Sequence, residues 1–156
     1  MVLPKGGLII LLNGSAEFPS FGNTFHVVRH ANIFIMTSQY LFEKKENYLL
    51  LIISGAYDKE DFMAYPTLIS EECKKEKIDK VLVNGLSLSG TNVPTMDRFF
   101  VAENIANILG PKVKIAVVWP KEHINKFAET VAVNRGSLIN VTDSIEAAKI
   151  WLLRKT

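Results

Sequence analysis

The segment 81–95, "VLVNGLSLSGTNVPT", concentrates the hydroxyl groups with which this chain could do chemistry. Ser87, Ser89, Thr91 and Thr95 follow a strongly apolar run and precede a well-marked helical pattern. Hydroxyls before a helix N-terminus can carry a phosphate, since the helix dipole favours negative charge there. They can also help to bind an anion. We expect these residues to lie in a loop between a strand and a helix.

Two nucleophilic or hydrolytic interpretations of this segment are weaker. Gly85 and Gly90 have the first half of the spacing of a nucleotide-binding P-loop, but the Lys that such a loop needs is absent. A nucleophile elbow requires a tight strand-to-helix turn, and several residues separate Ser87 from the helix. Asp97 and His123 do follow in the chain order of some hydrolases. A hydrolase is therefore the third-ranked expectation, and no base is visibly placed beside a nucleophile.

Two arginines add charge near helix ends. Arg98 follows the start of the helix after the hydroxyl-rich segment and could supply a charged fork to an anion. Arg135 lies in "NRG" at 134–136, where the Gly is typical of a helix C-terminus and the Arg could contact a ligand or partner. The candidate ligand-binding or phosphorylation residues are Ser87, Ser89, Thr91, Thr95, Arg98 and Arg135.

Short apolar runs predict the strands. The segment 38–57 has the pattern of a β-hairpin, because Tyr40 and Phe42 alternate with polar neighbours and "KKEN" forms a polar turn. The continuous run "YLLLIIS" then indicates a central strand covered on both faces. Further strands are expected at 78–85, 112–119 and 137–141.

Capping residues predict the helices between them. Asp58 caps the first, and Pro66 should kink or restart it. Thr95 is the expected N-cap of the second, which Gly110 ends. A third helix is expected over 121–136, and a last one over 144–155 behind a capping box of Asp143 and Glu146. Alternating strands and helices imply a single α/β domain, a mostly parallel sheet flanked by helices with an antiparallel hairpin at its edge.

The first 35 residues have a less regular pattern of apolar and polar residues than the rest of the chain. They lack a sustained helical period and contain three short apolar runs broken by turn formers. We therefore expect residues 1–35 to be an appendage and the domain to span 36–156. The alternative is that "FHVVRH" and "NIFIM" at 25–36 add edge strands. His26 and His30 are four residues apart, with no acidic third ligand nearby to complete a metal site.

The overall composition and charge argue against some classes of protein. The chain has 156 residues, 48% of them hydrophobic, and a formal net charge of +2, which argues against nucleic acid as a partner. The single cysteine, Cys73, fits a reducing compartment, and no run of about 18 apolar residues predicts membrane insertion. We expect a cytoplasmic protein without a metal or cofactor, in which Trp119 and Trp151 pack in the core.

Three segments resemble the SpoIIAA-like (STAS-like) family of small bacterial domains related to anti-sigma factor antagonists. They are "SGAYDKEDFMAYPTLISE", "MDRFFVAENIANILGPKVKIAVVWP" and "KFAETVAVNRGSLINVTDSIEAAKIWL", and the resemblance covers roughly 38–153. It implies a sheet flanked by helices and a non-enzymatic regulatory or binding role. Antagonists of this family carry a phosphorylatable Ser in an Asp-Ser-Ser-Gly segment before the second helix. This chain lacks that segment and has the hydroxyls of 87–95 instead.

Residues and resemblance together predict a non-catalytic module. The leading hypothesis is protein–protein interaction, with phosphorylation in the segment before the second helix as its regulation. The alternative is a small-molecule or lipid carrier with a pocket between helix and sheet. Whether the chain forms a homodimer through an edge strand stays open.

Overall fold

The computed structural model describes residues 37–155. The expectations for residues 1–35, as an appendage or as a source of edge strands, lie outside the described residues. So do the start of the domain at Met36 and the two histidines at 26 and 30.

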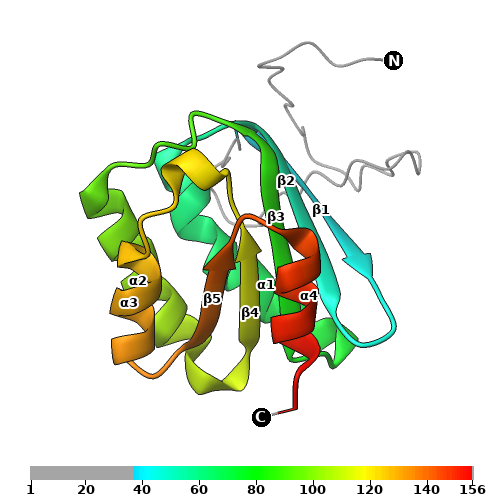
Figure 1. Cartoon of the computed structure of the whole chain (residues 1–156). Helices are drawn as coiled ribbons and strands as arrows, with labels where there is room; N and C mark the ends of the chain where they lie inside the picture. Colours follow the sequence, from blue (N-terminus) through cyan, green and yellow to red (C-terminus); the bar gives the residue numbers. More distant parts are fainter. Residues whose placement is uncertain (1–36, 156) are drawn as a thin grey trace, which may run out of the picture.

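A five-stranded sheet organises the described part of the chain (Figure 1). Its strands lie side by side in sequence order, with the first pair antiparallel and every later pair parallel. The strands are β1 (Ser38–Lys44), β2 (Leu49–Ala56), β3 (Lys80–Ser89), β4 (Lys114–Val118) and β5 (Leu138–Thr142). The predicted α/β class, with a mostly parallel sheet and an antiparallel edge hairpin, is confirmed.

Helices cover both faces of this sheet. Each parallel connection is expected to cross over with the same hand, and the strand order advances in one direction, so the three connecting helices share one face. They are α1 (Lys59–Glu76), α2 (Thr95–Ile108) and α3 (Phe127–Asn134). The last helix, α4 (Ile145–Leu153), packs on the other face, against β3, β4 and β5 (Figure 1). Short 3₁₀ turns follow α2 and β4, at Gly110–Lys112 and Lys121–His123.

Two hydrophobic layers result. Beneath α1, α2 and α3 lie the inward residues of the central strands, among them Leu51, Ile53, Val81 and Ile115. Beneath α4 lies a smaller cluster formed by Leu82, Ala116, Val118, Ala148 and Leu152. Cys73 belongs to the larger layer, and burial raises the pKa of its thiol to about 11, which makes a reactive thiolate unfavourable.

The edge strand β1 is tied to α1 by a buried carboxylate. The backbone N–H and the hydroxyl of Ser38 both donate to Oδ2 of Asp61, at 2.7 and 2.9 Å. The Ser38 hydroxyl also hydrogen-bonds to that of Tyr65. Asp58 caps the same helix as expected, accepting from the N–H groups of Glu60 and Asp61.

One helix is continuous where a break was expected, and two others have different N-caps. α1 continues through Pro66, which is buried, so the helix does not restart there. Thr95 is the first residue of α2 and Pro94 is its N-cap, with no side-chain capping bond. The cap of α4 is Ser144 and not Asp143: Oγ of Ser144 accepts from the N–H of Ala147.

The third helix is shorter than expected. Residues 121–126 precede it as a 3₁₀ turn and a bend, and Lys126 adopts the left-handed conformation with φ of 60°. The side-chain oxygen of Asn125 accepts from the N–H of Phe127 and so stabilises the start of α3. At the other end Gly136 has φ of 90°, as a glycine after a helix C-terminus should.

β3 extends further than its sequence indicated, which corrects the loop prediction for Ser87 and Ser89. A register shift after Asn84 lets the strand resume pairing, with Ser87 opposite Ser54 and Ser89 opposite Ala56. Pairing with β2 decides the conformation here, although the Ser- and Gly-rich sequence is typical of a loop. The true loop is the short segment 90–94.

Gly85 in β3 lies directly under the ring of Trp119. A Cβ placed on Gly85 would lie 2.5 Å from Cζ3 of that indole. We therefore expect Gly85→Ala to lower the free energy of unfolding by about 1–3 kcal/mol, as overpacking does. Urea denaturation would measure it.

A second background separates this clash from a general loss of strand stability. In a Trp119→Leu protein the same Gly85→Ala change should be milder, because the indole is gone. Equal losses of unfolding free energy in both backgrounds would contradict the clash.

Candidate functional site

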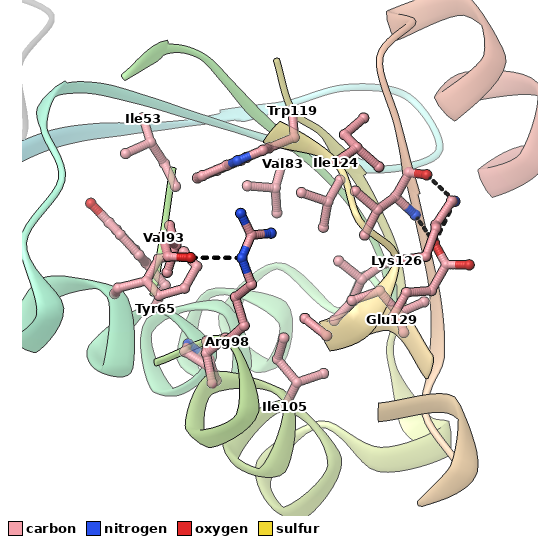
Figure 2. Close-up of a pocket in the computed structure, with 18 of the residues that line it drawn as sticks. Ile53, Tyr65, Val83, Val93, Arg98, Ile105, Trp119, Ile124, Lys126 and Glu129 are labelled. Carbon is pink, nitrogen blue, oxygen red and sulfur yellow. Dashed lines mark hydrogen bonds and ion pairs between the residues drawn. The ribbon is translucent and has the colours of Figure 1, made fainter. Parts of the chain in front are cut away.

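The candidate site lies at the carboxyl ends of β3, β4 and β5, where open α/β sheets usually bind ligands. Two connections meet there: the loop 90–94 before α2, and the segment 119–126 before α3. Figure 2 shows side chains that line the pocket next to these connections.

Thr91 joins the two connections. It is 4% exposed, and its hydroxyl lies 2.8 Å from Nδ1 of His123. Its carbonyl accepts a 3.1 Å hydrogen bond from the indole N–H of Trp119. The buried hydroxyl therefore holds the loops together, and it is not presented to solvent for modification.

Arg98 makes a second connection between the same loops. Its Nε donates to the carbonyl of Val93 at 2.8 Å, and its Nη2 donates to that of His123 at 2.9 Å. The side chain is 8% exposed and points from α2 toward the sheet, beneath Trp119 (Figure 2). Burial lowers the pKa of the guanidinium from its ordinary value, which nevertheless leaves it charged at neutral pH.

Asp97, the neighbour of Arg98 in the sequence, contacts the start of α1 and the residue before its cap. Its carboxylate accepts from the hydroxyl of Tyr57 at 2.8 Å and lies 3.4 Å from Nζ of Lys59. Burial, followed by the bond to Asp97, raises the pKa of Tyr57. Since Asp97 is engaged by Tyr57 and His123 by Thr91, the structure does not assemble a Ser–Asp–His arrangement from these residues.

An apolar pocket of about 110 Å³ lies between the sheet and α1, α2 and α3. Its floor is the sheet, with Ile53, Val83 and Ile115 among the lining side chains, and Trp119 covers one end (Figure 2). The few polar side chains in its lining include Arg98, Asn125, Lys126 and Glu129.

Lys126 and Glu129 close one side of this pocket (Figure 2). Nζ of Lys126 lies 2.7 Å from Oε2 of Glu129 and also donates to the carbonyl of Val141. Oε2 of Glu129 accepts from the N–H of Val141 at 2.6 Å. Neither residue was predicted from the sequence, where their only signal was the three-residue spacing of opposite charges within the helix expected over 121–136.

The remaining candidate residues lie on other surfaces. Ser87 is exposed on β3, and the hydroxyl of Ser89 donates to the carbonyl of Gly55 at 3.0 Å. Thr95 is exposed at the first turn of α2. The structure therefore does not bring the four hydroxyls together in one anion-binding site.

Arg135 lies at the far end of α3, away from the pocket lining. Its guanidinium pairs with Glu103 of α2 at 3.1 Å and lies 5.3 Å from the ring centroid of Phe99. These contacts join α3 to the outer side of α2. Trp119, expected in the core, is buried there and also lines the pocket.

The order of strands and helices defines a STAS-like fold, as two solved structures show. One is an anti-sigma factor antagonist from Mycobacterium paratuberculosis, similar over 75% of this chain and 95% of that one, with a TM-score of 0.54 and 11% sequence identity. The other is the NMR structure of the protein TM1081, similar over 85% and 99% of the two chains, with a TM-score of 0.50 and 12% identity. Identities this low establish the fold alone.

Comparison of the sequence itself with protein-family models and with curated proteins gives no match. Within residues 37–155, no helix has the length and apolar character needed to cross a membrane.

The Thr91–His123 pair should be measurable as a coupling between two positions. Thr91→Val and His123→Leu each remove one partner, and their double-mutant cycle should give a coupling of about 1 kcal/mol in unfolding free energy. Urea denaturation of the four proteins measures it. Additive losses would show that the hydrogen bond does not stabilise the two loops.

Proposed function

We propose that this chain is a non-catalytic regulatory module that binds a protein partner through the outer side of α2. The observation that carries the proposal is an apolar stripe on that helix. We call it the α2 face and define it as Met96, Phe99 and Phe100. Met96 is 59% exposed and Phe100 is 43% exposed.

Helical spacing places these three side chains on one side of α2. The rings of Phe99 and Phe100 contact edge to face, with centroids 5.7 Å apart. Aromatic side chains and Met are enriched in protein interfaces, and large ones contribute most of the binding energy. The α2 face therefore has the chemistry of an interface core.

Charged groups surround the α2 face. Nζ of Lys59 lies 6.0 Å from the ring centroid of Phe100, and the ion pair of Arg135 and Glu103 flanks Phe99. A polar, charged rim around an apolar centre is the common anatomy of a protein interface. The similarity in fold to an anti-sigma factor antagonist, whose name describes action on another protein, supports the same role.

Thr95 is the proposed site of phosphorylation. It is exposed and directly precedes Met96 of the α2 face, whereas Thr91 is buried and bonded to His123. A phosphate would add a charge of about −1.5 to −2 beside the apolar stripe. The helix dipole would tolerate that charge, but an apolar partner surface would not.

A small-molecule carrier is the second candidate function. The apolar pocket beside Arg98 is the observation that favours it, because carrier sites combine apolar walls with a few polar groups.

Affinity capture from native cell extract tests the proposed interface. Met96→Ser combined with Phe100→Ser should lose a specific protein that the unaltered chain retains. Thr95→Glu should weaken the same capture by at least about tenfold, because it places a charge beside the interface. Quantitative mass spectrometry, followed by titration of the purified partner, measures both effects.

Ile150→Ser is the matched control. Ile150 is 62% exposed on α4, which packs on the other face of the sheet, so the change removes a comparable apolar surface elsewhere. Capture should survive it. A partner retained equally by all variants would contradict binding through the α2 face, and native protein without phosphate on Thr95 under every growth condition would contradict the switch.

A further inference from the structure

Arg98 is a buried cation whose hydrogen-bonded partners are neutral. Both acceptors are main-chain carbonyls, of Val93 and His123. Within residues 37–155, no carboxylate lies within ion-pair distance of its guanidinium. A buried charge without a counter-ion is unfavourable, so this position is suited to an anion that arrives with a ligand.

The carboxylates of Asp97 and Glu129 already bond to other groups. Asp97 is bonded to Tyr57 and lies near Lys59, on the side of α2 that faces α1. Glu129 lines the pocket but is held by Lys126 and by the N–H of Val141. Neither carboxylate neutralises Arg98.

The space in front of the guanidinium is apolar. Figure 2 shows the Arg98 side chain reaching into the pocket between Val93, Trp119 and Ile124. The opposite lining is formed by branched aliphatic side chains, among them Val83, Ile105 and Ile115. A ligand here must therefore carry one compact charged group on an apolar body.

The volume of the pocket sets the size of that body. A cavity of about 150 Å³ accommodates benzene, with six carbons, so 110 Å³ corresponds to about four or five carbons. A long acyl chain exceeds this space. The planar guanidinium matches a carboxylate, whereas a phosphate dianion would need further donors that this apolar lining does not supply.

We infer that the pocket binds a short branched carboxylic acid, whose carboxylate pairs with the Arg98 guanidinium and whose apolar body of about four carbons fills the space beneath Trp119. The inference names the ligand class of the second candidate function and rests on it. It does not depend on the protein partner, because the pocket lies on the inner side of α2 and the α2 face on the outer side.

Titration of the full chain with isovalerate (3-methylbutanoate), followed by NMR or calorimetry, tests this assignment. Isovalerate should bind saturably with one site. Its neutral analogue isovaleramide should bind at least about tenfold more weakly, because it cannot pair with the cation. Octanoate and isobutyl phosphate should also bind more weakly than isovalerate, because one is too long and the other too highly charged.

Two substitutions tie binding to the pocket. Arg98→Met should weaken isovalerate binding at least about tenfold, and Arg135→Met, which removes the same charge from an exposed position, should leave it within about twofold. Arg98→Met also removes the ties to Val93 and His123 and can impair folding. Ala128→Leu therefore provides a second variant, which fills the pocket from α3 while Arg98 itself is unchanged, and it should abolish binding.

Several outcomes would overturn the inference. They are absence of saturable isovalerate binding, equal binding of isovaleramide, tighter binding of octanoate or of isobutyl phosphate, and binding that survives Ala128→Leu. None of them affects capture of a protein by the α2 face, so a failure of the ligand site and a failure of the partner interface are separate results.

Discussion

The site depends on one buried charge. Arg98 reaches inward from α2 and holds the loops that follow β3 and β4 by one carbonyl each. Thr91 and Trp119 repeat this connection with neutral groups. The loops 90–94 and 119–126 are therefore held in fixed relative positions by side chains that bond to both. Because Trp119, which covers the pocket, belongs to the second loop, the cover of the pocket is fixed relative to α2 as well.

This arrangement separates two sides of one helix. The inner side of α2 carries Arg98 and the apolar side chains that line the pocket, and its outer side carries the α2 face. Nearby residues serve the two sides: Met96 is 59% exposed on the α2 face, whereas Arg98 is buried and turns toward the sheet. A ligand that shifts Arg98 would also shift α2, the helix that carries Met96 and Phe100. Ligand binding and partner binding could influence each other in this way.

Local patterns predicted the fold well and the site only in part. Apolar runs and caps such as Asp58 indicated the elements, because they report on chain conformation within a few residues. The extension of β3 through Ser87 and Ser89 depends on pairing with β2, which a turn-like local sequence conceals. Arg98 was recognised as an anion-binding candidate, but its burial and its contact with His123, 25 residues later, are tertiary facts. The pocket was expected only as a general possibility of the fold, since its walls come from seven helices and strands and the loops between them.

The close approach of Gly85 and Trp119 has an evolutionary consequence. The indole occupies the space that a side chain at position 85 would need. In related sequences these two positions should therefore change together: glycine should accompany a large aromatic residue, and a smaller residue at 119 should release position 85. Because Trp119 also covers the pocket, the pair could serve as a marker that sorts relatives by the size of the molecule they hold.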